Sequence, residues 1–169
     1  LQAYTQPAPD DGLREIRGRA VVALYLATGV TLSEGIATEL DDLQLDATLP
    51  YLHIKAKAAR GARTVPITPF AIPALRTWLT RRAAEGTQGR ALLTLHTDGA
   101  RINEASVGRI VKAALTTIDF VAPDMSPRVL RNTVCRRLLL DGVDYVEVNR
   151  ILGLSSVRTV DRIAATIER

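Results

Sequence analysis

The sequence predicts a mainly α-helical domain with a small antiparallel sheet, which is an α+β fold. Several stretches repeat apolar residues at the i, i+3, i+4 spacing of an amphipathic helix, and many of them start at a capping residue or stop at a glycine. Three short β-prone stretches lie close together between residues 43 and 67. The length of 169 residues suits one domain with one core.

The first half of the chain contains the expected sheet. Residues 1–12 are acidic and proline-rich, so we expect a linker there, followed by one domain over residues 13–169. The first helix is expected over residues 13–28, with Gly29 as its stop, and Ser33 is a candidate cap for a short second helix. Strands are expected at Leu43–Leu45, Tyr51–Ala56 and Thr64–Ile67, the last two forming a hairpin with its loop at Ala58–Ala62.

The second half is expected to be almost entirely helical. Proline directly after Ser126 is typical of a capped helix start, and a strand is expected at Ala91–Leu95. The expected helices run from Thr68 to Ala84, Asn103 to Thr117, Ser126 to Asp141, Val143 to Leu152, and from a cap at Ser155 or Ser156 to Ile167.

Positive charge is concentrated in one segment. The net charge is +4, but residues 1–50 hold three basic and eight acidic side chains, whereas residues 51–90 hold eight basic and one acidic. A clustered basic patch attracts polyanions such as nucleic acid. A solvated basic face is the alternative that charge alone leaves open.

The composition argues against membrane and metal functions. The longest apolar run, Ala20–Ala27, is much shorter than the roughly 20 residues of a membrane span, and no signal peptide is visible. A single cysteine, Cys135, excludes an internal disulfide, and with only His53 and His96 beside it a zinc site lacks ligands. We therefore expect a cytoplasmic protein without metal or cofactor.

Four segments, in order, resemble the catalytic domain of tyrosine recombinases, the phage-integrase family. Each motif alone is weak, but their order and spacing across residues 13–165 are specific. The resemblance implies that family's fold, and a longer protein whose N-terminal DNA-binding domain precedes residue 1. The segments are Ala27–Glu34 (ATGVTLSE), Lys55–Ile67 (KAKAARGARTVPI), Ser126–Thr133 (SPRVLRNT), and Gly142–Asp144 followed by Ile151–Ser156 (ILGLSS).

The resemblance also implies a chemistry. In that family a tyrosine attacks a DNA phosphate and forms a 3′ phosphotyrosine. Two arginines and a histidine or tryptophan hold the non-bridging oxygens, where charge develops in the transition state. A lysine on the hairpin protonates the leaving 5′ oxygen, and a further histidine assists proton transfer. The cationic side chains make a metal unnecessary.

Most of these positions are replaced in this chain. The second arginine is intact, as Arg131. The hairpin lysine falls on Ala58, and its neighbour Lys57 is a candidate if the loop shifts by one residue. Since an isoleucine cannot attack phosphorus, we expect no strand cleavage, and the nearest tyrosine, Tyr145, is expected at an apolar helix position. The replaced positions are the first arginine (Thr31), the two histidines (Arg128 and Leu154) and the nucleophile (Ile163).

The sequence therefore favours a catalytically inactive DNA-binding domain, a monomer in free solution that acts as a regulator or partner of an active recombinase. One alternative is a structural or protein-interaction remnant that no longer binds DNA. The other is an active site-specific recombinase with a rearranged or trans-supplied nucleophile. Arg128 and Arg131 share a helix face, where they form an anion site or pair with acidic residues in 34–46. The expected DNA contacts are Lys55, Lys57, Arg60, Arg63, Arg128 and Arg131.

Overall fold

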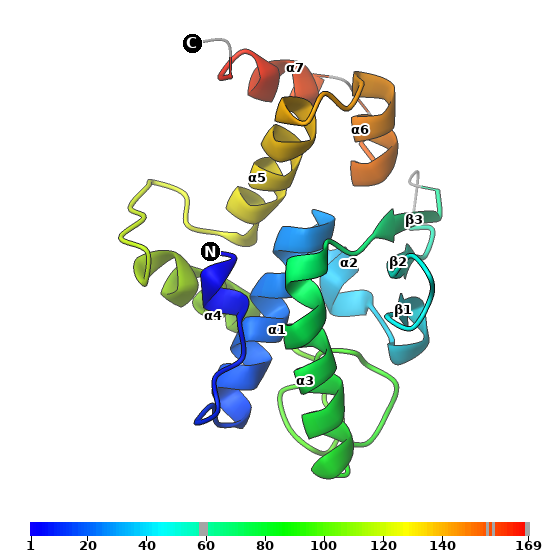
Figure 1. Ribbon diagram of the computed structural model, residues 1–169, viewed down its shortest axis with the longest axis vertical. Helices are drawn as coiled ribbons and strands as arrows, with labels where there is room; N and C mark the ends of the chain where they lie inside the picture. Colours follow the sequence, from blue (N-terminus) through cyan, green and yellow to red (C-terminus); the bar gives the residue numbers. More distant parts are fainter. Residues whose placement is uncertain (58–60, 155, 157, 168–169) are drawn as a thin grey trace.

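The computed structural model describes residues 1–57, 61–154, 156 and 158–167. It confirms a mainly helical fold with a three-stranded antiparallel sheet (Figure 1). Among the described residues, no helix is long and apolar enough to cross a membrane. The elements are η1 (Ala3–Thr5), α1 (Leu13–Thr28), α2 (Leu32–Ala37), η2 (Leu40–Asp42), β1 (Leu43–Gln44), β2 (Tyr51–Ile54), β3 (Arg63–Pro66), η3 (Pro69–Ala71), α3 (Ile72–Ala84), α4 (Glu104–Thr116), α5 (Pro127–Leu140), α6 (Tyr145–Leu152) and α7 (Arg158–Ala164).

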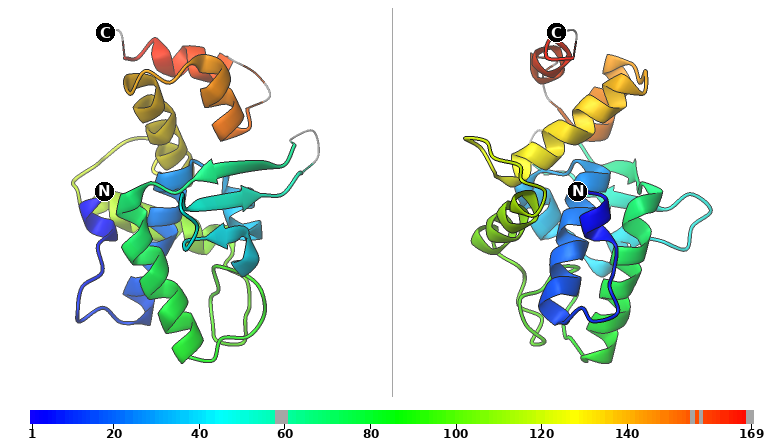
Figure 2. Two further views of the ribbon diagram at one scale, coloured as in Figure 1. Left: turned by 45° about the vertical axis from the view of Figure 1, so that its right-hand side comes forward. Right: turned by 60° about the vertical axis from the view of Figure 1, so that its left-hand side comes forward.

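Helix α1 is the centre of the main core. Eleven of its sixteen residues are buried, and it packs against α3, α4 and α5 (Figure 2). It ends where the sequence predicts, at Gly29, whose φ of 65° lies in the left-handed region. A Cβ at Gly29 would lie 2.6 Å from the Leu152 side chain. The glycine therefore both ends α1 and lets the end of α6 approach it.

The sheet alternates buried and exposed residues. Its order is β1-β2-β3, and Leu52 pairs with Val65. Leu52 and Ile54 are buried while His53 is exposed, as period-2 alternation requires. The predicted strand at 91–95 does not join this sheet. That segment makes only isolated bridges, at Ala91 and Thr94, and its leucines fill the core.

Capping residues set helix starts that the sequence placed slightly differently. Helix α2 is capped by Thr31, not by Ser33. The Thr31 hydroxyl accepts from the Glu34 backbone N–H, and the Glu34 carboxylate accepts from the Thr31 N–H, which is a capping box. Helix α6 begins at Tyr145 because Asp144 caps it. The predicted cap of α5, Ser126, is confirmed.

Residues 1–12 pack against the domain, in contrast to the expected linker. Thr5 is fully buried. Arg19 of α1 donates hydrogen bonds to the Asp11 carboxylate, at 2.5 and 2.9 Å, and to the Tyr4 carbonyl. The acidic character that suggested a linker is thus part of a contact with α1.

The three C-terminal helices form a second, smaller core above the first in Figure 1. An ion pair connects this smaller core to the main core. Arg63 of β3 donates to both Glu34 carboxylate oxygens, at 2.9 Å each, and its Nε donates to the Ile151 carbonyl at 2.9 Å. One guanidinium therefore joins α2, β3 and α6. The buried members of the smaller core are Val134, Cys135, Val148, Leu152, Val160 and Ile163.

The partners of Glu34 keep its carboxylate ionised despite its burial. Burial alone would raise the pKa of Glu34, but the Arg63 guanidinium and the Thr31 backbone N–H stabilise the carboxylate and lower its pKa to about 2. An ordinary glutamate has a pKa of about 4.3. The stability that this carboxylate contributes is therefore fully present above about pH 4.3 and is lost as the pH falls toward 2.

We expect Glu34→Gln to lower the free energy of unfolding by about 3–5 kcal/mol, because it leaves the Arg63 charge buried without its counter-charge. Urea unfolding at pH 7 measures the loss. The double variant Glu34→Gln/Arg63→Met should lose less than the sum of the two single variants, because no unpaired charge remains. An unchanged unfolding midpoint for Glu34→Gln would show that the pair does not hold the two cores together.

Candidate nucleic-acid interface

A cleft of about 450 Å³ lies where the loop after α1, the start of α5 and the last two helices meet. It brings together four family positions that are far apart in the sequence: Thr31, Arg128, Arg131 and Leu154. The predicted site residues outside the hairpin thus share one hollow. The lining residues are Val30, Thr31, Leu32, Ser126, Pro127, Arg128, Arg131, Asn132, Leu154, Thr159 and Arg162.

Thr31 lines this cleft and is the N-terminal cap of α2. Its hydroxyl caps α2 by accepting from the Glu34 N–H at 3.3 Å. A threonine carries no charge, so the position of the family's first arginine contributes no cation here.

Arg131 joins two helix ends. Its guanidinium donates to the Gly29 carbonyl, just after α1, and to the Leu152 carbonyl at the end of α6, the latter at 2.6 Å. Carbonyls at helix C-termini lack intrahelical partners and carry partial negative charge. Arg131 therefore stabilises the walls of the cleft as well as lining it.

Arg128 is exposed and is paired with a nearby carboxylate. Its Nε and Nη2 lie 2.9 and 2.8 Å from Asp124 Oδ2. Hydrogen bonds from Ser126, first from its side chain and then from its backbone, together with Arg128, lower the pKa of Asp124 to about 2. Arg128 thus pairs with Asp124 rather than with the acidic residues in 34–46.

The position at which the resemblance places the nucleophile is buried. Ile163 is 8% exposed and packs in the smaller core, and Leu154 is half-buried at the cleft wall. None of the described residues that line the cleft is a tyrosine. Tyr145, which was expected at an apolar position, is 42% exposed at the start of α6, and Tyr25 is fully buried.

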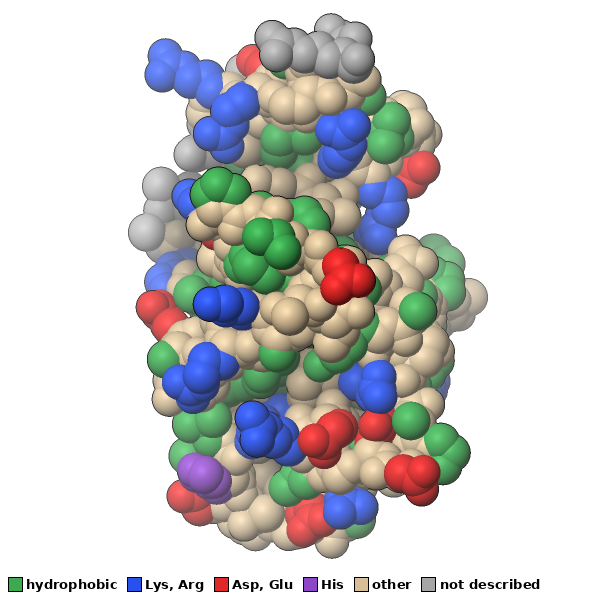
Figure 3. Space-filling model, turned by 90° about the vertical axis from the view of Figure 1, so that its left-hand side faces the viewer, with side chains coloured by type: hydrophobic (Ala, Val, Ile, Leu, Met, Phe, Trp, Pro, Cys, Tyr) green, Lys and Arg blue, Asp and Glu red, His purple; other side chains and the backbone are tan. Residues whose placement is uncertain are grey.

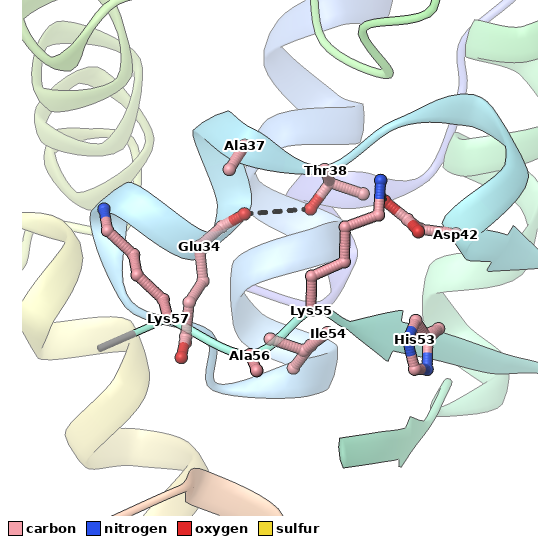
Figure 4. A pocket seen from close by; sticks show the side chains of 9 residues that line it. All are labelled: Glu34, Ala37, Thr38, Asp42, His53, Ile54, Lys55, Ala56 and Lys57. Carbon is pink, nitrogen blue, oxygen red and sulfur yellow. Dashed lines mark hydrogen bonds and ion pairs between the residues drawn. The ribbon is translucent and has the colours of Figure 1, made fainter. Parts of the chain in front are cut away.

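The hairpin differs from the expected row of DNA contacts. The Lys55 ammonium lies 2.7 Å from Glu39 and 3.5 Å from Asp42, and Figure 4 shows it directed toward Asp42. Lys57 points away from Lys55 in the same view, and it is exposed. The expectation for Arg63 is corrected, because its buried side chain is held by Glu34. Ala58 and Arg60 lie outside the described residues.

Acidic residues from 39–46 balance much of the positive charge of residues 51–90. Arg90 Nη2 lies 2.6 Å from Asp41, and Arg76 Nη2 lies 2.8 Å from Asp46. Lys55 joins the same group through Glu39. The two oppositely charged blocks of the sequence therefore meet at the sheet.

Three polar residues of the cleft were not predicted from the sequence: Asn132, Thr159 and Arg162. The helical pattern of the last segment does indicate that Arg162 is exposed. Val160, Ile163 and Ala164 are the buried residues of α7, so Arg162 lies on its other side.

No group of three or more potential ligands that could hold a metal ion is found among the histidine, cysteine, aspartate and glutamate residues in the described part of the chain. The charged side chains that line the cleft are arginines. This arrangement can bind an anion through guanidinium hydrogen bonds.

Comparisons with known proteins agree with the fold. The model of the phage integrase family matches residues 5–166. Tyrosine recombinase XerD of Mycobacterium tuberculosis is 32% identical over 154 residues, which cover 89% of this chain and 48% of the relative. Tyrosine recombinase XerC of Corynebacterium glutamicum is 34% identical over 146 residues, which cover 85% and 45%. The chain spans about half the length of these curated relatives.

Among solved structures, XerH site-specific recombinase bound to its difH substrate superposes with a TM-score of 0.80 at 20% identity, covering 99% of this chain and 50% of that one. This likeness concerns the fold. Together with the family match over nearly the whole length, it shows that the chain belongs to the phage integrase family and has the fold of a tyrosine recombinase catalytic domain.

Proposed function

We propose that this domain binds DNA through its arginine-lined cleft and does not cleave it. The observation that carries the proposal is the composition of the cleft. Its described lining contains Arg128, Arg131 and Arg162 and no carboxylate, while the nucleophile position is the buried Ile163. XerH, a relative in fold, is described in complex with its difH substrate, which makes DNA the polyanion that we favour.

The cleft suits a phosphate group for two physical reasons. Guanidinium groups form short, charge-assisted hydrogen bonds to phosphate oxygens. The fourteen-residue helix α5 also begins at the cleft, at Ser126 and Pro127, so its positive dipole end faces the site. Both contributions are independent of base sequence, so we expect them to support affinity rather than sequence recognition.

Strand cleavage would need groups that this cleft lacks. Removing one oxyanion donor from other enzymes costs about 2.7–4 kcal/mol of transition-state stabilisation, and Thr31 and Leu154 each replace such a donor. We therefore propose a role on DNA beside an active recombinase, in the cytoplasm, for a domain that is monomeric when free.

We propose a smaller set of DNA contacts than the sequence suggested. Arg131 and Lys57 remain in the set, and Arg60 remains as expected from the sequence. Arg128 and Lys55 contribute less, because Asp124 balances the charge of Arg128, and Glu39 and Asp42 balance that of Lys55. Arg63 leaves the set because it is buried.

We expect weak binding of a mixed-sequence duplex, with a dissociation constant of roughly 10⁻⁴–10⁻⁶ M near physiological salt that rises steeply with salt. Fluorescence anisotropy across a salt series measures it. Lys57→Ala should weaken binding more than Lys55→Ala, although both remove one positive charge, because Lys55 is already paired. Absence of salt-dependent binding would contradict the proposed function, and a larger loss in Lys55→Ala would contradict this assignment of the hairpin lysines.

We expect no covalent adduct with a nicked suicide duplex, the substrate that traps the phosphotyrosine of an active recombinase. Denaturing electrophoresis detects the adduct, and an active family member on its own site is the positive control. Ile163→Tyr should not restore an adduct, because Thr31 still leaves the phosphate oxygens without the first arginine. A wild-type adduct that maps to any tyrosine would overturn the proposal of inactivity.

A further inference from the structure

We propose that Arg162 is the main phosphate-binding residue of the cleft, and that it binds the DNA backbone in a groove that continues beyond the family's catalytic positions. The inference rests on the proposed function and deepens it. It concerns a residue at a position to which the family resemblance assigns no role.

The cleft opens into a second hollow. A neighbouring cavity of about 570 Å³ shares Arg128, Asn132 and Arg162 with the first. Residues 128, 132 and 136 of α5 are four apart, so they lie along one face of that helix. The two hollows therefore form one groove along α5, with α7 as its other wall. In Figure 3, basic side chains flank the indented surface between the C-terminal helices and the body below.

Other arginines of this groove are already engaged. Arg128 pairs with Asp124, Arg131 donates to two carbonyls, and Arg136 donates to the carbonyl and hydroxyl oxygens of Thr166, at 3.2 and 2.9 Å. Arg162 is exposed, and no hydrogen bond or ion pair joins its side chain to another described residue. Its donors are therefore available to an incoming anion.

The position of Arg162 follows from the burial of its neighbour. Val160 and Ile163 anchor α7 in the smaller core, which leaves Arg162 on the groove side, where it lines both hollows. The family's first arginine falls on Thr31, which lines the same cleft. A cation on α7 thus supplies positive charge to a cleft that lacks that arginine.

The length of the groove favours a nucleic-acid backbone over a free phosphate compound. A single small anion fills only part of either hollow, whereas successive phosphates of a strand can occupy both hollows, each of which Arg162 lines. The guanidinium groups and the helix N-terminus of the groove bind phosphates whatever the base sequence, and the carboxylate of its described lining, Asp124, is paired with Arg128.

The test compares Arg162→Ala with Arg158→Ala. Both variants remove one positive charge from α7, but Arg158 is not among the residues lining either hollow. We expect Arg162→Ala to weaken duplex binding about tenfold, as loss of a charge-assisted hydrogen bond does, and to reduce the salt slope by about one. Arg158→Ala should weaken binding no more than about twofold. Circular dichroism melting checks that both variants remain folded.

The outcomes separate this inference from the proposed function. If wild-type protein binds DNA and the two variants lose affinity equally, Arg162 contributes only general charge and the inference is wrong, while DNA binding stands. If the wild type shows no salt-dependent DNA binding, the proposed function is wrong, and the inference that rests on it is wrong as well. A parallel titration with pyrophosphate tests whether the groove binds a free phosphate compound as well as it binds a nucleic-acid backbone. Binding of pyrophosphate as tight as that of the duplex, lost in Arg162→Ala, would overturn the assignment to a nucleic-acid backbone.

Discussion

The geometry of the cleft depends on the carboxylate of Glu34. It accepts hydrogen bonds from the Thr31 backbone, which starts α2, and from Arg63, whose Nε in turn holds the Ile151 carbonyl of α6. The contact leaves no space for a larger residue at Gly153, where a Cβ would lie 2.5 Å from the Arg63 guanidinium. The left-handed backbone of Gly153 lets α6 end at that point. One buried ion pair therefore fixes the relative position of the two cores that form the cleft.

Three residues at positions that carry catalytic groups in the family make structural contacts in this chain. Arg131 is retained, and its two carbonyl contacts hold together the ends of α1 and α6. Thr31 contributes a helix cap, which an arginine cannot provide through its side chain because it has no acceptor. Ile163 adds apolar area to the small core, where a tyrosine hydroxyl would need a partner. Each of these three side chains therefore has a structural role in the fold.

Local signals made most of the fold predictable. Caps and glycines act within a few residues, so the bounds of α1 and the start of α5 could be read directly. The cap of α2 was also readable, because the T-x-x-E spacing of Thr31 and Glu34 identifies the capping box and Ser33 lacks it. The role of Arg63 was not readable. It follows from the approach of α6, which lies 88 residues further along the chain.

Contacts between residues far apart in the sequence also explain why the most basic segment of the sequence is not an unpaired basic surface in the structure. Counting charge along the chain located a positive block at 51–90, but the acidic residues in 39–46 reach it only once the sheet has formed, through pairs such as Lys55 with Glu39 and Arg90 with Asp41. The carboxylate of each pair lies beside its cation and repels a phosphate, so the pair attracts DNA less than an unpaired cation does. Among the described arginines that line the groove, Arg162 of α7 has no such partner, and burial of Ile163 leaves it facing the groove. The surface that attracts phosphates is therefore determined by which positive charges the fold leaves unpaired, and not by where the sequence is most basic.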